Sequence, residues 1–137
     1  MLRRAFLILF IVYGAFELTA GIMQITQSAE TINAQFGSDV LTPPALIYVQ
    51  GFGNGLLTLG VLSLLAVFIR HATTRAVLAG GFALFNVLAA YSCLTVPNIP
   101  TAFSAAGYVH ALFAVLFAVA AFVYWQDSQE LFHENEI

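Results

Sequence analysis

The chain has 137 residues, of which 61% are hydrophobic and 8% are charged, and its formal net charge is −3. Soluble domains usually carry about 25% charged residues, so this composition excludes an ordinary soluble protein and predicts an integral membrane protein. The negative charge comes mainly from a short acidic tail, which argues against a nucleic-acid partner.

Four apolar stretches are long enough to span the hydrocarbon core of a bilayer, which requires about 20 residues in a helix. They cover residues 5–26, 44–69, 75–94 and 105–125. Little of the chain is left over. The sequence therefore predicts one all-α domain, residues 1–137, that folds as an integral membrane four-helix bundle.

The connection between the first two stretches is predicted to hold a short amphipathic helix at the membrane interface. Ser28 is the expected cap, and Ile32, Phe36 and Val40 recur every four residues along one face. The second outside connection, Val96–Pro100, is short and contains two prolines.

The arginines predict the orientation of the chain. Arg3 and Arg4 precede the first stretch, and Arg70 and Arg75 lie between the second and third, whereas the other two connections carry no Lys or Arg. The positive-inside rule then places both termini in the cytoplasm. A twin-arginine export signal is the alternative for the first stretch, but the apolar run is long for a signal peptide and holds Glu17.

Glu17 lies mid-way along the first stretch, where a carboxyl group is costly and marks either a function or a specific packing contact. Polar residues recur at a similar depth in the other stretches. At 1.5 Å per residue, Glu17 and Asn86 lie about 13 Å from the predicted outer ends of their helices, and Asn54 about 15 Å. The predicted polar layer consists of Glu17, Gln50, Asn54, Asn86 and His110.

Each stretch also carries small residues on the face that holds its polar residue, and small residues let membrane helices approach closely. We therefore predict that the polar groups face the helix contacts in all four stretches. The four faces are Gly14, Glu17, Gly21 and Gln24; Gly51, Asn54, Gly55 and Thr58; Ala79, Ala83, Asn86 and Ala90; and Gly107, His110, Ala114 and Ala121.

Such a layer predicts a ligand site, with helix packing as the alternative. Glu17 and His110 can share a proton across the bundle near neutral pH. The three amide side chains of the layer add hydrogen-bonding groups, so all five residues are candidate contacts for a small lipophilic ligand such as a quinone or lipid. Asn, Gln and His also serve simply to hold membrane helices together.

No metal or redox cofactor is evident in the sequence. Cys93 is the only cysteine, so an internal disulfide is impossible and no cysteine–histidine cluster predicts a zinc site. A single intramembrane histidine, His110, does not supply the usual two-ligand haem site.

Three features resemble one known group of proteins. They are the acid at the end of Tyr13–Glu17, the glycine-rich run Gln50–Gly60 and the arginine-bearing turn Arg70–Arg75 before a third span rich in small residues. Together they resemble the DoxX-like small four-helix membrane proteins of bacteria. The resemblance implies a multi-pass protein of the bacterial inner membrane. Some members are linked to quinone-dependent sulfur oxidation, and others are accessory or chaperone-like subunits.

Four functions are compatible with the pattern, and binding of a lipophilic ligand is the one we predict. The alternatives are an accessory subunit of a larger membrane complex and an isomerase in which Glu17 and His110 move protons on a buried lipid. A proton-coupled exporter is also possible, but four helices would have to form a homodimer to enclose a pathway.

Overall fold

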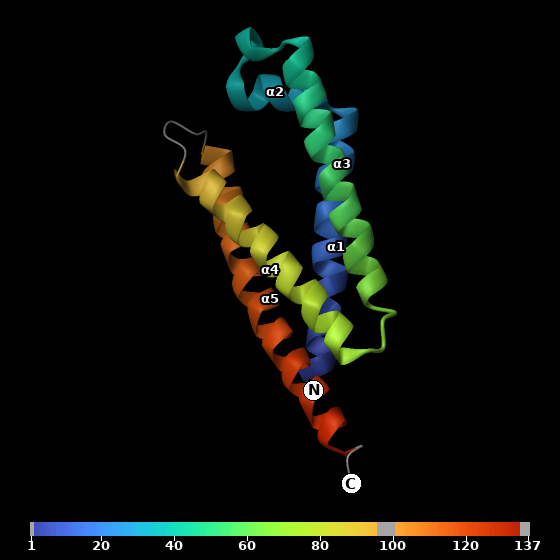
Figure 1. The fold of residues 1–137 in the computed structure, drawn as a ribbon. Helices are drawn as coiled ribbons and strands as arrows, with labels where there is room; N and C mark the ends of the chain where they lie inside the picture. Colours follow the sequence, from blue (N-terminus) through green and yellow to red (C-terminus); the bar gives the residue numbers. More distant parts are fainter. Residues whose placement is uncertain (1, 96–100, 135–137) are drawn as a thin grey trace. The chain divides into compact units, whose positions relative to one another are not determined.

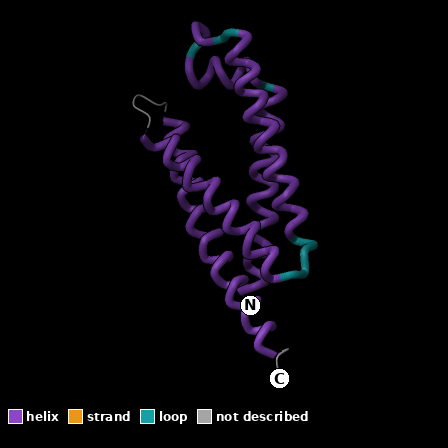
Figure 2. Tube along the Cα trace, in the orientation of Figure 1, coloured by secondary structure: helices purple, strands orange, loops and turns teal. Residues whose placement is uncertain are grey.

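The computed structural model describes residues 2–95 and 101–134, and these residues form helices joined by short connections (Figure 1, Figure 2). The elements are α1 (Leu2–Thr26), α2 (Ser28–Phe36), the 3-10 turn η1 (Ser38–Val40), α3 (Pro43–Ala66), α4 (Ala72–Thr95) and α5 (Thr101–Glu134). Within these ranges there is no strand. The helices α1, α3, α4 and α5 are long and apolar enough to cross a membrane. The predicted all-α class is therefore confirmed for the described residues, and the four long helices support the predicted multi-pass membrane protein. The predicted outside connection at 96–100 lies outside the described residues.

The helices divide into two compact units, Met1–Val67 and Phe68–Ile137. In the first unit α1 packs along α3, and α2 contacts both helices (Figure 1). In the second unit α4 packs along α5. The assembly of all four long helices into one bundle stays a prediction.

The predicted spans match the helices closely except at the C-terminal end. The last span was expected to end at Trp125, but α5 continues to Glu134. Hydropathy marks where a helix leaves the apolar phase, whereas the helix itself continues as long as its residues tolerate helical geometry. Ser128 fits into this extension, because its hydroxyl donates to the carbonyl of Trp125 over 2.7 Å.

Glycines bring α1 and α3 into close contact. A Cβ atom added at Gly21 would lie 2.8 Å from the carbonyl oxygen of Gly53. One added at Gly60 would lie 2.9 Å from the carbonyl oxygen of Gly14. Side chains at these positions would push the two backbones apart, so the close approach depends on glycine.

The predicted contact face of α3 is wrong for its packing against α1. The residues that α3 buries are Gly53, Leu56, Gly60, Ser63 and Ala66. A Cβ atom added at Gly51 or Gly55 would meet nothing within 4 Å. The reason is that α3 carries glycines on two faces, and the spacing of small residues does not say which face a partner helix covers.

The short helix α2 forms where it was predicted, but Ser28 is not its cap. Gln27 holds the cap position, and no side chain caps the helix. Ser28 is instead the first helical residue, and its buried hydroxyl accepts a hydrogen bond from Nε2 of Gln50 over 3.3 Å. This hydrogen bond therefore links α2 to α3.

The predicted apolar face of α2 is only partly formed. Ile32 is buried, whereas Phe36 and Val40 are each nearly half exposed. The helix ends at Phe36, and the φ of the next residue, Gly37, is +87°, which lies in the region that side chains rarely adopt. Val40 belongs to the separate turn η1, so the four-residue repeat does not continue as one helical face.

In the second unit, α4 and α5 pack together through side-chain contacts. The rings of Phe82 on α4 and Phe117 on α5 have centroids 5.2 Å apart. The Arg75 guanidinium lies 5.5 Å from the ring centroid of Tyr124, an arrangement typical of cation–π contacts. These contacts fix the antiparallel register of α4 and α5.

The predicted contact faces of the second unit are largely confirmed. The small and polar residues of these two faces that are buried are Ala79, Asn86, Ala90, Gly107, His110 and Ala114. Ala83 and Ala121 are only partly buried. The polar residues of α4 and α5 thus lie at the contact between the two helices.

Candidate functional site

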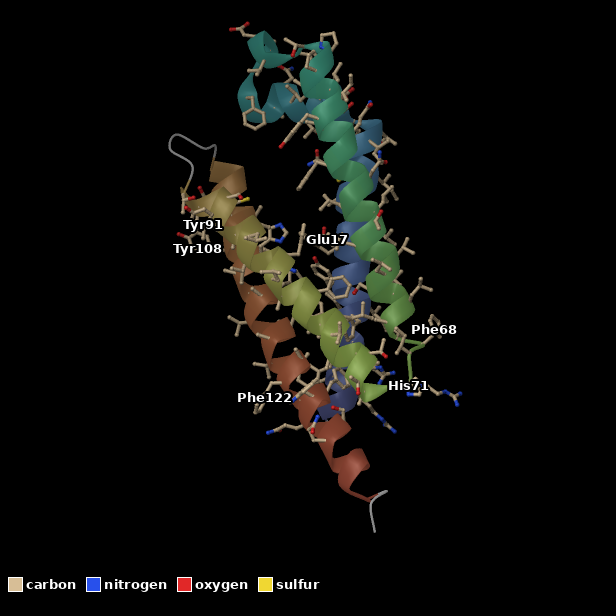
Figure 3. The ribbon with its side chains drawn as sticks, viewed as in Figure 1. Glu17, Phe68, His71, Tyr91, Tyr108 and Phe122 are labelled. Carbon is tan, nitrogen blue, oxygen red and sulfur yellow. The ribbon has the colours of Figure 1, made fainter. Side chains whose placement is uncertain are left out.

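Glu17 projects from the middle of α1 and is fully buried (Figure 3). It continues a stripe of large buried side chains that includes Phe6, Phe10 and Tyr13. The side chain of Tyr13, one turn earlier, interacts with the carboxyl group. Neither carboxyl oxygen reaches the geometry of a full hydrogen bond with any described residue.

An incompletely paired carboxyl group is costly in this position. A buried polar group that lacks a full hydrogen bond destabilises a fold by about 1–3 kcal/mol, and more if it is charged. At bilayer depth water does not compensate for the loss. The carboxyl group of Glu17 can accept hydrogen bonds, bind a cation or exchange a proton. The described residues around it do not supply a full hydrogen bond to either oxygen.

Asn86 and His110 form the second buried polar group, and their side chains contact each other. Nδ1 of His110 lies 2.8 Å from Oδ1 of Asn86, and Nδ2 of Asn86 donates to the carbonyl of Phe82 over 2.8 Å. The edge of the histidine ring is also set against Phe85, at 6.2 Å between centroids and 80° between planes. The side chain of His110 is therefore held in place by α4.

The two remaining candidates, Gln50 and Asn54, are exposed on α3. Gln50 is engaged by Ser28, as described above. The backbone carbonyl of Asn54 accepts a hydrogen bond from the hydroxyl of Thr58 over 2.9 Å, which is a contact within one helix. Within the first unit these amides do not share the buried environment of Glu17. Their roles as ligand contacts, and the meeting of Glu17 with His110, stay predictions.

One buried polar residue of α3 was missed in the sequence. The hydroxyl of Ser63 donates to the carbonyl oxygen of Phe10 over 2.8 Å and links α3 to α1. Ser63 follows Gly60 by three residues and Gly53 by ten, so it shares their face of the helix. That spacing is a usable signal of the buried face, although Asn54 on the other glycine face of the helix competes with it.

The first unit also has a shallow groove on the surface of α3, lined by Leu57, Thr58, Val61 and Leu62, with a volume of about 270 Å³. Sites for small molecules usually have volumes of about 300–1,000 Å³ and enclose their ligand. This open groove is smaller and does not include Glu17. It does not by itself identify a ligand site.

Comparison with protein-family models, curated protein sequences and solved structures gives no significant match. The resemblance to the DoxX-like group therefore stays a prediction. Among the described residues, no group of three His, Cys, Asp or Glu side chains is placed to hold a metal ion.

Proposed function

We propose that the protein binds a small lipophilic molecule with a polar group, such as a quinone or a lipid, within the membrane, and that Glu17 is its polar anchor. The observation that carries the proposal is the full burial of the Glu17 carboxyl without a complete hydrogen bond. A chain that retains such a group gives up stability, and functional sites are where that loss is usually compensated.

The chemistry of the site limits the class of ligand. The carboxyl group of Glu17 can bind a hydroxyl, an amine or a cationic head group, and the apolar residues around it favour a hydrophobic body. Phe10 and Tyr13 lie on the same buried face as Glu17. Their aromatic rings are suited to pack against a ring or an acyl chain.

Native mass spectrometry combined with lipid analysis of the purified protein tests this proposal. We expect a stoichiometric lipophilic molecule in the wild type that is lost in Glu17→Gln. The matched control is Thr19→Val, which removes a hydroxyl group from an exposed position on the same helix and should retain the molecule. Equal retention by wild type and Glu17→Gln would overturn the proposal.

An accessory subunit of a larger membrane complex is the second candidate. The observation that favours it is the open space at Gly51 and Gly55 on α3, where another helix could approach closely. Replacing Gly51 or Gly55 with leucine should then remove a co-purifying protein without unfolding the chain. Under the ligand proposal the same replacements leave the bound molecule in place.

We further propose that all four long helices form one bundle in a bacterial inner membrane, with both termini in the cytoplasm. The arginines support this orientation, because the positive-inside rule places Arg3, Arg4, Arg70 and Arg75 in the cytoplasm. The exposed side chains of Tyr48, Tyr91 and Tyr108 lie near helix ends that would then meet the opposite membrane interface. Figure 3 shows Tyr91 and Tyr108 at the same end of the α4–α5 pair. Tyrosine is enriched at membrane interfaces. A reporter that is active only in the cytoplasm should be active when it is fused to either terminus.

A further inference from the structure

The connection between α3 and α4 has a length that keeps it among the lipid headgroups. Both helices are long and apolar enough to cross a membrane, and only residues 67–71 separate Ala66, the end of α3, from Ala72, the start of α4. A connection of this length that leaves the bilayer and returns extends at most about 8 Å beyond the helix ends. The headgroup layer is about 5–8 Å thick on each side of the hydrocarbon core. Side chains of the connection therefore lie at headgroup depth.

The side chains at this connection combine an apolar ring with basic and hydroxyl groups. Phe68 is 80% exposed, and Arg70 and His71 are exposed as well. Figure 3 shows Phe68 and His71 at the connection that follows α3. Thr73 and Thr74 add exposed hydroxyl groups in the first turn of α4. All five residues belong to the second unit, so their grouping does not depend on how the two units are arranged.

The charge of the connection is positive, because the sequence around it contains no acid. The chain has no Asp or Glu between Asp39 and Asp127. Asp127 lies on α5 one turn after Tyr124, and the guanidinium of Arg75 already packs over the Tyr124 ring. We therefore assign no ligand role to Arg75. The exposed guanidinium of Arg70 is the cation of the connection that can meet an anion in the headgroup layer.

We propose that this connection binds an anionic phospholipid of the cytoplasmic leaflet, with the lipid phosphate on Arg70 and His71 and the acyl chains against Phe68. A guanidinium group offers a phosphate two parallel N–H donors, and a neutral imidazole always carries one N–H donor. The positive-inside rule places Arg70 in the cytoplasm, where the membrane surface is negative. A free phosphate would leave the exposed ring of Phe68 uncovered, whereas a phospholipid covers it. The site does not involve Glu17 and is independent of the proposed function.

Native mass spectrometry of the protein in detergent micelles tests the proposal by titration with phosphatidylglycerol or phosphatidylcholine. The two lipids carry the same acyl chains, and only the first has a net negative headgroup. We expect the wild type to bind the first phosphatidylglycerol molecule about fivefold more tightly, as for one arginine near an anionic headgroup. Equal affinities for the two lipids would overturn the proposal, and this comparison requires no variant.

Two variants with the same change of charge distinguish a local site from the overall charge of the protein. Arg70→Gln should lose the preference for phosphatidylglycerol and keep its affinity for phosphatidylcholine, which also shows that the variant is folded. Arg4→Gln removes an exposed arginine from α1 and should keep the preference. An equal loss in the two variants, or a preference that survives Arg70→Gln, would overturn the assignment to the connection.

The contact with the acyl chains is tested separately. Phe68→Ser should weaken the binding of both lipids by about tenfold, because the ring no longer packs against their chains. Glycerol phosphate, which has the anionic group without acyl chains, should not displace bound phosphatidylglycerol at an equal concentration. Unchanged binding of both lipids to Phe68→Ser, or displacement by glycerol phosphate, would overturn the assignment of a phospholipid.

Discussion

Each unit of the chain contains an antiparallel pair of long helices, but the buried polar groups of the two units differ in how fully they are hydrogen-bonded. In the α4–α5 pair, the amide of Asn86 bonds to both Phe82 and His110, so these groups satisfy one another across the helix contact. In the unit built from α1, α2 and α3, the carboxyl of Glu17 is buried without a full hydrogen bond.

This difference separates two reasons for keeping a polar residue in a membrane helix. A mutually satisfied pair such as Asn86 and His110 stabilises the fold and can also aim a side chain. A buried acid without a full hydrogen bond stabilises the fold less than an apolar residue of similar size would. Glu17 is therefore the stronger candidate for a function that packing does not explain.

Disruption of the glycine contact should give the largest loss of stability. Gly21→Leu places a side chain against the backbone of α3 and should destabilise the protein by about 3 kcal/mol. Gly55→Leu is the control, because its position is open and should change the stability little. Unfolding in mixed detergent micelles, followed by circular dichroism, gives both values. Equal losses would contradict the assigned contact face of α3.

The polar contact of the second unit should show a smaller energetic coupling. A double-mutant cycle with Asn86→Leu and His110→Phe should give about 1 kcal/mol of interaction energy, as for other polar contacts between membrane helices. Asn86→Leu combined with Tyr108→Phe should be additive, because Tyr108 is exposed. A coupling near zero in the first cycle would mean that the two residues do not interact in the membrane.

Removal of the Ser63 hydroxyl should cost less again. Ser63→Ala deletes the hydrogen bond to the Phe10 carbonyl and should lower the stability by about 0.6 kcal/mol, because that carbonyl keeps its bond within α1. Thr58→Ala is the matched control, since its hydroxyl bonds within α3 alone and is exposed. The same detergent unfolding assay applies. A larger effect of Thr58→Ala would place the wrong face of α3 against α1.

The smallest effect is expected at Gln50. Gln50→Leu removes an exposed amide and one long hydrogen bond to Ser28, so the stability should change by about 0.5 kcal/mol or less. The molecule bound to the purified protein should be unaffected. Loss of that molecule would return Gln50 to the ligand site that the sequence predicts.

The sequence predicts the helices well because the bilayer imposes their length and composition. It predicts the contact side less well, and α3 shows why: Gly51 and Gly53 lie on different faces, and only the packed structure shows that Gly53 meets α1. The face of Asn86 and the face of His110 were both predictable. Their hydrogen bond was not, because it depends on the register between α4 and α5, which side-chain packing sets.

We propose that Glu17 is present because it binds a ligand, and that helix packing does not require it. The most direct test compares the unfolding of wild type and Glu17→Gln in delipidated detergent and again after addition of a native membrane lipid extract. Without lipid, Glu17→Gln should be at least as stable as wild type, and the extract should stabilise the wild type alone. A wild type that is clearly more stable than Glu17→Gln without lipid, with no selective gain from the extract, would contradict the claim and make Glu17 a packing residue.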